Sequence, residues 1–138
     1  MSRSYEKELK TLLKAGALVI EIASYEWQRV HGFVNDVADD LERGWYTWSS
    51  VFGIKKWTGK GFKEVNPDAQ TLASALDFYL QIEEDLIIIL EDFHPYSDTA
   101  NPVNIRHIRE MTRQHSYTKP KFKKAIILSS PVKFIPEE

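Results

Sequence analysis

Apolar residues fall into two patterns along the chain, stripes at helical spacing and short runs that are apolar throughout. The short runs are rich in β-branched residues, as strands buried on both faces of a sheet are. Together with one aromatic segment they predict four main strands, at Ala17–Ala23, Trp45–Ser49, Leu86–Leu90 and Ala125–Ser129. Leu86–Leu90, with the sequence LIIIL, is the most apolar and is expected in the middle of the sheet.

Helical stripes with capping residues occupy the stretches between these strands. One helix precedes the first strand and ends at Gly16, and a second begins after Ser24 and ends at Gly44. The four predicted helices are Ser4–Ala15, Tyr25–Glu42, a segment opened by Asn66-Pro67-Asp68 that runs to Leu80, and Asn101 to about His115.

Strands that alternate with helices predict an α/β fold, with a parallel sheet of about four main strands and flanking helices. The segment at about 52–65 interrupts this alternation. In it, Gly53–Trp57 and Phe62–Val65 flank Thr58–Gly61, so we expect a hairpin inserted between the second strand and the third helix. Residues 1–138 are expected to form one domain.

The composition is that of an ordinary globular domain. The chain has 138 residues, of which 43% are hydrophobic and 28% charged, as in ordinary globular domains. It has no cysteine, which excludes disulfides, thiolate nucleophiles and cysteine-bound metals. A net charge of −2 gives no basic field for nucleic acid, and no apolar run is long enough for a membrane. From composition alone we expect a location in the cytoplasm.

A nucleotide site would need glycines and a lysine at the turn after the first strand, to wrap a phosphate at a helix N-terminus. Ala23–Arg29 has neither, and it places Glu26 where the anion would lie. Gly53–Gly61 contains a Gly-Lys-Gly end, but its spacing, the missing Ser/Thr and the nearby Pro67 all differ from a phosphate loop. No bound nucleotide or other cofactor is predicted.

Acidic residues follow the central strand, where α/β proteins often place function. Glu91 and Asp92 occupy this position, and we expect them to cap the turn Phe93–Tyr96. The four histidines lack metal-ligand spacing, although His94 lies near Asp92 in the sequence. The sequence therefore predicts no metal site, no catalytic residue and no enzymatic activity for the isolated chain.

Aromatic and basic residues alternate between the second strand and the hairpin. Packing within the protein accounts for most such rings, yet rings interleaved with lysines can also stack on single-stranded nucleic acid. We take this segment as the best candidate for a binding surface. Its residues are Trp45, Trp48, Lys55, Lys56, Trp57 and Lys60.

Charge is unevenly distributed along the second half of the chain. Residues 64–100 contain nine acids and no Lys or Arg, whereas residues 101–138 contain eight Lys/Arg and three acids. Solvated helix faces explain such runs most simply. The alternative is a surface of two signs, with an acidic third helix and a basic fourth helix, suited to head-to-tail association.

Three stretches resemble one protein family. The chain resembles the amino-terminal domain of the AAA+ ATPases of cyanobacteria, plastids and other bacteria that are called hypothetical chloroplast open reading frame proteins. The stretches are Leu12–Ala15 with Val19–Glu26, Leu90–Tyr96, and Ile127–Val132 with Ile135-Pro136. The family-like motif residues are Ser24, Tyr25, Glu26, Glu91, Asp92, Phe93, His94 and Pro95.

The resemblance implies an AAA+-like, P-loop NTPase topology without a phosphate loop, in the strand order first, fourth, third, second. It implies a non-catalytic accessory domain that acts in, or on, an AAA+ ATPase, whose full-length family members are ATPases. The ATPase motifs are absent before Glu138, so the chain is either a fragment or a free-standing, for example viral, accessory protein. The partner is then a protein, the isolated chain is mostly monomeric, and the resemblance adds the plastid stroma to the cytoplasm as an expected location. The alternative is a degenerate nucleotide- or nucleic-acid-binding domain that uses residues 45–63.

Overall fold

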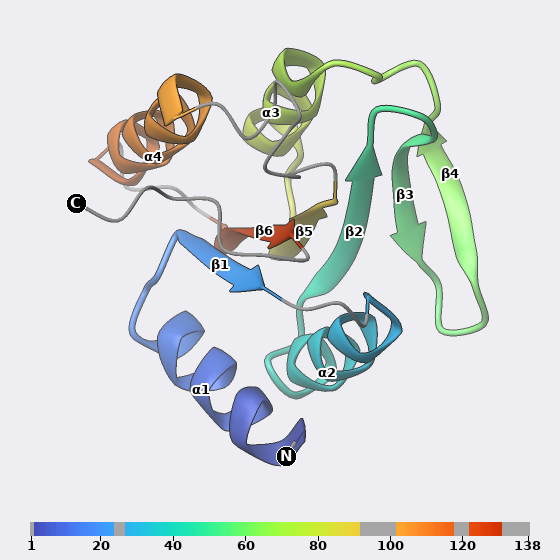
Figure 1. The fold of residues 1–138 in the computed structure, drawn as a ribbon, viewed down its shortest axis with the longest axis vertical. Helices are drawn as coiled ribbons and strands as arrows, with labels where there is room; N and C mark the ends of the chain where they lie inside the picture. Colours follow the sequence, from blue (N-terminus) through green and yellow to red (C-terminus); the bar gives the residue numbers. More distant parts are fainter. Residues whose placement is uncertain (1, 24–26, 92–101, 118–121, 131–138) are drawn as a thin grey trace.

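A six-stranded sheet lies between two pairs of helices in the computed structural model, which describes residues 2–23, 27–91, 102–117 and 122–130 (Figure 1). Helices α1 and α2 cover one face of the sheet, and α3 and α4 cover the other. The elements are α1 (Ser2–Lys14), β1 (Val19–Ala23), α2 (Trp27–Asp40), β2 (Gly44–Ser49), β3 (Gly53–Trp57), β4 (Phe62–Asn66), α3 (Leu72–Gln81), β5 (Leu86–Leu90), α4 (Pro102–Tyr117) and β6 (Lys124–Ser130). No described helix is long and apolar enough to cross a membrane.

The sheet has the order β1-β6-β5-β2-β3-β4. Its first four strands are mutually parallel, and they stand in the order predicted for the four main strands. The prediction of a purely parallel, four-stranded sheet is wrong, because β3 and β4 extend the same sheet with antiparallel pairing. The predicted hairpin exists, but it continues the sheet beyond β2.

A glycine permits the turn that brings β3 back alongside β2. Gly53 has a φ of +72°, which costs a residue with a side chain about 1–2 kcal/mol. A Cβ atom built at Gly53 would lie 2.3 Å from the backbone oxygen of Asn66. The position therefore requires glycine for its conformation and for the close approach of β4, and it joins the hairpin to the sheet.

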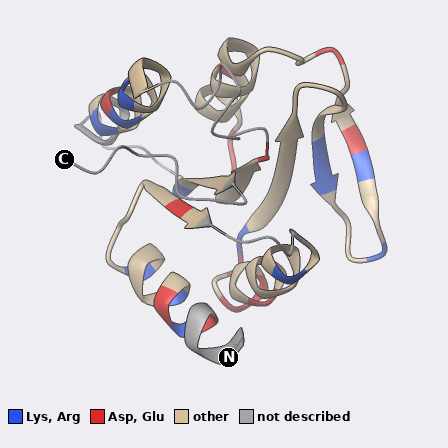
Figure 2. Cartoon of the chain, in the orientation of Figure 1, with Lys and Arg blue, Asp and Glu red and all other residues tan. Residues whose placement is uncertain are grey.

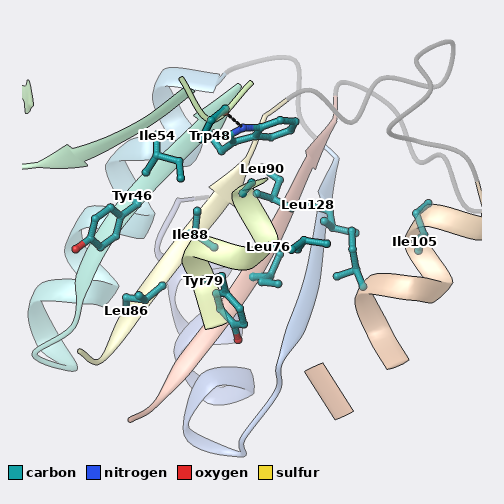
Figure 3. Close-up of a cluster of buried hydrophobic side chains, with 14 residues drawn as sticks. Tyr46, Trp48, Ile54, Leu76, Tyr79, Leu86, Ile88, Leu90, Ile105 and Leu128 are labelled. Carbon is teal, nitrogen blue, oxygen red and sulfur yellow. Dashed lines mark hydrogen bonds between the residues drawn. The ribbon is translucent and has the colours of Figure 1, made fainter. Parts of the chain in front are cut away.

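Both faces of the central strand are buried, as its apolar sequence predicts. Leu86, Ile88 and Leu90 face α3 and α4, in the cluster of buried side chains drawn in Figure 3. Ile87 and Ile89 face α1 and α2 in a second buried cluster. Side chains alternate between the faces of a strand, so β5 contributes to two separate cores.

Charged residues in β1 and β6 have partners on the helices. Glu21, which interrupts the apolar run of β1, accepts a bond from Arg109 of α4 at 2.6 Å. Lys124, at the start of β6, is buried, and its Nζ donates to the backbone oxygens of Tyr79 and Leu80 at 2.8 and 3.2 Å. These carbonyls belong to the last turn of α3, so the lysine caps that helix. Burial lowers the pKa of Lys124.

Two helix ends differ from the prediction. Helix α3 begins at Leu72, with Thr71 and Ser74 forming a reciprocal capping box, instead of at Asn66-Pro67-Asp68. Helix α2 ends at Asp40, and Glu42 adopts the left-handed conformation expected of a glycine, with φ 56°. Ser24, Tyr25, Glu26 and Asn101 lie outside the described residues.

Candidate functional site

The predicted binding surface is divided between the core and the exterior. Trp48 is fully buried, and its Nε1–H donates to the carbonyl oxygen of Ala69 at 2.7 Å (Figure 3). The ring packs against Leu90 and Ile54 in the cluster beneath α3 and α4. Trp48 is therefore a core residue that ties the segment before α3 to the sheet, and it does not belong to a surface.

Trp45 lies on the opposite face, in a row of rings that crosses β2, β3 and β4. Its ring stacks on Trp57 with centroids 5.7 Å apart, and Trp57 meets Phe62 edge-on at 5.1 Å. Trp45 is buried, and its Nε1–H donates to Asn35 of α2 at 3.0 Å. Trp57 is half-buried and Phe62 is exposed. The row thus runs from the core at β2 to the surface at β4.

A histidine of α2 joins this row to the end of the central strand. The ring of His31 lies edge-on to Trp45 and Phe62, with centroids 5.5 and 5.7 Å apart. Its Nε2 makes a hydrogen bond with Oε1 of Glu91, the residue that follows β5. The carboxylate that stands where an α/β enzyme would hold a metal is thus bound by a protein side chain. Asp92, Phe93, His94 and Pro95 lie outside the described residues.

The lysines of the hairpin have different surroundings. Lys56 forms an ion pair with Glu84 at 3.3 Å, and its Nζ lies 5.3 Å from the ring centroid of Tyr46. The other carboxylate oxygen of Glu84 is buried and has no hydrogen-bond partner among the described residues, and burial raises the pKa of this group. Lys55 lies over the Phe52 ring at 4.2 Å, and Lys60 is exposed at the hairpin tip.

Exposed apolar side chains lie along the hairpin and in the turn between β2 and β3 that precedes it. Of the six large apolar residues that are exposed in the described part of the chain, four lie between positions 51 and 65. They are Val51, Phe52, Phe62 and Val65, with exposed fractions of 66, 59, 39 and 41%. Together with Lys55, Lys60 and Lys63 they form what we call the hairpin surface. These residues lie in or next to the predicted hairpin and outside every helical stripe, and this position could have identified them from the sequence.

The two-signed surface, the alternative interpretation of the charge runs, would require an acidic α3, and this helix is only weakly acidic. That helix carries one acid, Asp77, which accepts a bond from Gln81 at 2.9 Å. Asp85, beyond its end, accepts a bond from the backbone N–H of Lys123 at 2.7 Å. Figure 2 shows basic residues on α4 and on the hairpin, with acidic ones dispersed over several elements. The described residues contain no group of three or more potential ligands placed to hold a metal ion.

The comparisons with known proteins cover almost the whole chain. Residues 5–138 match the family described as SpoVK-like AAA ATPase, N-terminal domain. A relative from Guillardia theta, an uncharacterized AAA domain-containing protein named ycf46, is 28% identical over 120 residues. The matched region is 83% of this chain and 23% of the relative, so the chain spans about a quarter of that protein. No solved structure matches. The predicted resemblance is confirmed, and the chain belongs to the family of SpoVK-like AAA ATPase N-terminal domains.

Proposed function

We propose that this domain is a non-catalytic accessory domain of an AAA ATPase, which binds a protein partner through the hairpin surface. The observation that carries the proposal is the gathering of Val51, Phe52, Phe62 and Val65 on one sheet extension, outside both cores. Scattered exposed apolar residues need no explanation, but a group rimmed by polar residues is typical of protein-binding sites. Lys55, Lys60 and Lys63 stand among these apolar residues along the hairpin.

The state of Glu91 supports a non-catalytic role. In a working nucleotide site, a carboxylate at the end of the central strand must be free to engage a metal ion or water. Here His31 holds it, and the rings of Trp45 and Phe62 pack on that histidine. The Gly53–Gly61 segment forms an antiparallel hairpin and does not lead from a strand into a helix as a phosphate loop does.

The order of the parallel strands supports an origin in the nucleotide-binding fold. We include in the proposal that this is an AAA+-like domain that has lost its phosphate loop. The supporting facts are the parallel order β1-β6-β5-β2 and the membership of an AAA ATPase N-terminal family. The hairpin is then an addition at the edge of β2, which is consistent with a role in binding.

Nucleic-acid binding has less support than protein binding. Stacking on bases requires accessible ring faces, whereas Trp45 and Trp48 are buried and hydrogen-bonded within the domain. Lys56 is paired with Glu84, which leaves fewer cations for phosphate groups. We therefore retain the protein partner, namely the ATPase module or ring, and expect the isolated domain to be mostly monomeric.

Binding to an ATPase module tests the proposal. The probe is the Guillardia theta relative with the matching segment deleted, and the readout is the fluorescence anisotropy of this chain labelled at its N-terminus. We expect Phe52→Ser to weaken binding about ten-fold or more, because buried aromatic anchors dominate interfaces. Val103→Ser is the matched control, since Val103 is 70% exposed on α4, and it should change the affinity less than about two-fold.

Absence of binding, or equal losses for Phe52→Ser and Val103→Ser, would contradict the proposed role of the hairpin surface. Light scattering of the chain alone, over a range of concentrations, tests the expected monomer. A stable closed oligomer that persists in high salt would show that the exposed apolar residues serve self-association.

A further inference from the structure

The outer edge of β4 is free along its described length. No described strand pairs with it, and all five of its residues are exposed. Thr58 N–H donates to Gly61 O at 2.9 Å, which makes this pair a hydrogen-bonded one. Hydrogen-bonded and non-hydrogen-bonded residue pairs alternate along an antiparallel ladder. The backbone of Lys63 therefore forms hydrogen bonds with β3, whereas the N–H and C=O groups of Phe62 and Glu64 point outward, away from β3.

The two sides of this edge differ chemically. Phe62 stands opposite Trp57, on the side of the sheet where the row of aromatic rings lies. Lys63 pairs with Lys56 of β3, and Lys56 pairs with Tyr46 of β2. Because Tyr46 faces α3 and α4, Lys63 lies on that face of the sheet, beyond the part that the helices cover. A strand added to β4 would meet an apolar ring on one side and a cation on the other.

The charge of the hairpin excludes a second copy of the chain as the favoured occupant. Residues 51–66 contain four lysines and one acid, and among the described residues only Lys56 of these lysines has an ion-pair partner. Pairing two β4 edges would bring these lysines together, and like charges across a pair of strands are destabilising. An acidic strand would instead place a carboxylate beside Lys63.

The other edge of the sheet is less suited to a guest strand. Residues 19–22 of β1 are buried or half-buried, and α1, α2 and α4 pack near this strand. In contrast, β4 is exposed on both sides. Native proteins protect free edges with lysines and bulges, and β4 has Lys63 and a register shift near Val65. These features oppose indiscriminate pairing, yet the lysine attracts an acidic guest.

We propose that β4 accepts an extended peptide as a seventh strand, in which acidic residues alternate with apolar ones. The acidic side chains lie beside Lys63, the apolar ones lie beside Phe62, and the guest backbone bonds to Phe62 and Glu64. This mode of recognition takes affinity from the backbone and specificity from alternate side chains. The inference rests on the proposed function, because it specifies what the hairpin surface binds.

The probe is an acetylated, amidated decapeptide of alternating valine and glutamate, titrated into the ¹⁵N-labelled chain. We expect its binding to shift the amide signals of Phe62 and Glu64 most. Two further peptides carry N-methyl groups, one on all its valines and the other on all its glutamates. At least one of these two peptides should fail to bind. An alternating valine–lysine decapeptide should bind about five-fold more weakly, because it loses one surface ion pair, which contributes up to about 1 kcal/mol.

Substitutions in β4 give a second, independent readout. Glu64→Pro removes an outward N–H and spares the bonds to β3, so it should abolish binding, whereas Glu64→Ala should retain it. Lys63→Glu should weaken binding of the acidic peptide and strengthen that of the basic one. If Glu64→Pro does not fold, the N-methylated peptides decide, because they act on the unmodified protein.

Each other outcome overturns the strand proposal. Peptide binding that tolerates N-methylation would show docking through side chains alone. Shifts of Phe62 and Glu64 that depend on protein concentration without peptide would indicate self-pairing. Tighter binding of a thymidine oligonucleotide than of the acidic peptide would favour nucleic acid. A peptide that does not bind overturns the strand proposal alone, because the assay with the ATPase module tests the hairpin surface separately.

Discussion

Replacing Trp48 by phenylalanine tests whether this tryptophan is structural. The substitution removes the indole N–H that bonds to the Ala69 carbonyl at 2.7 Å and leaves that carbonyl without this partner. An unsatisfied buried polar group costs about 1–3 kcal/mol. The smaller ring also gives up about 40 Å² of buried apolar surface, or about 1 kcal/mol. The free energy of unfolding should therefore fall by about 2–4 kcal/mol.

Urea unfolding followed by circular dichroism measures this loss without depending on tryptophan fluorescence. Trp57→Phe is the matched control, because Trp57 is half-buried and its indole makes no hydrogen bond with the part of the chain that the structure describes. Its loss should remain below about 1 kcal/mol, since its ring is partly in water already. A loss below about 1 kcal/mol for Trp48→Phe, or an equal loss for the two variants, would refute the division of the tryptophans into core and surface.

Three further predictions concern the backbone and the pH dependence. Glu42→Gly should stabilise the domain by up to about 1 kcal/mol, because Glu42 has a positive φ; a lower urea midpoint would contradict this. Gly53→Ala should destabilise it by more than about 2 kcal/mol, since the added Cβ meets the oxygen of Asn66, and near-wild-type melting would refute it. Burial raises the pKa of Tyr79, whose ordinary value is 10.0, so this group stabilises the fold below pH 10. Above pH 10 the wild type should lose about 1.4 kcal/mol per pH unit relative to Tyr79→Phe, and parallel pH profiles of the two proteins would contradict this.

The parallel part of the sheet could be predicted from sequence because its signals are local. LIIIL is apolar at every position, which requires cover on both faces, and helices between strands require parallel crossovers. The order of the four strands came with the family resemblance and agrees with the structure. The position of the hairpin in the sheet could not be predicted from the sequence. Its strands, GIKKW and FKEVN, are short and polar, and their pattern does not indicate which edge of the sheet they join.

The sequence located the candidate site but did not show which of its residues are buried and which are exposed. The sequence identified the aromatic–lysine segment, and parity along β2 places Trp45 and Trp48 on opposite faces. Parity does not tell which face a helix covers, so their burial could not be predicted. The bond between His31 and Glu91 joins residues sixty positions apart, on a helix and a strand end, and no local pattern signals it.

ATP turnover by the purified chain tests the central claim, a domain of an AAA ATPase that binds but does not catalyse. The assay measures phosphate release from magnesium-ATP by the wild type and by Glu91→Gln, at protein concentrations up to tens of micromolar. Because His31 binds the Glu91 carboxylate, we predict the same release from both proteins, at the level of the buffer alone. Turnover by the wild type that Glu91→Gln abolishes would contradict the account.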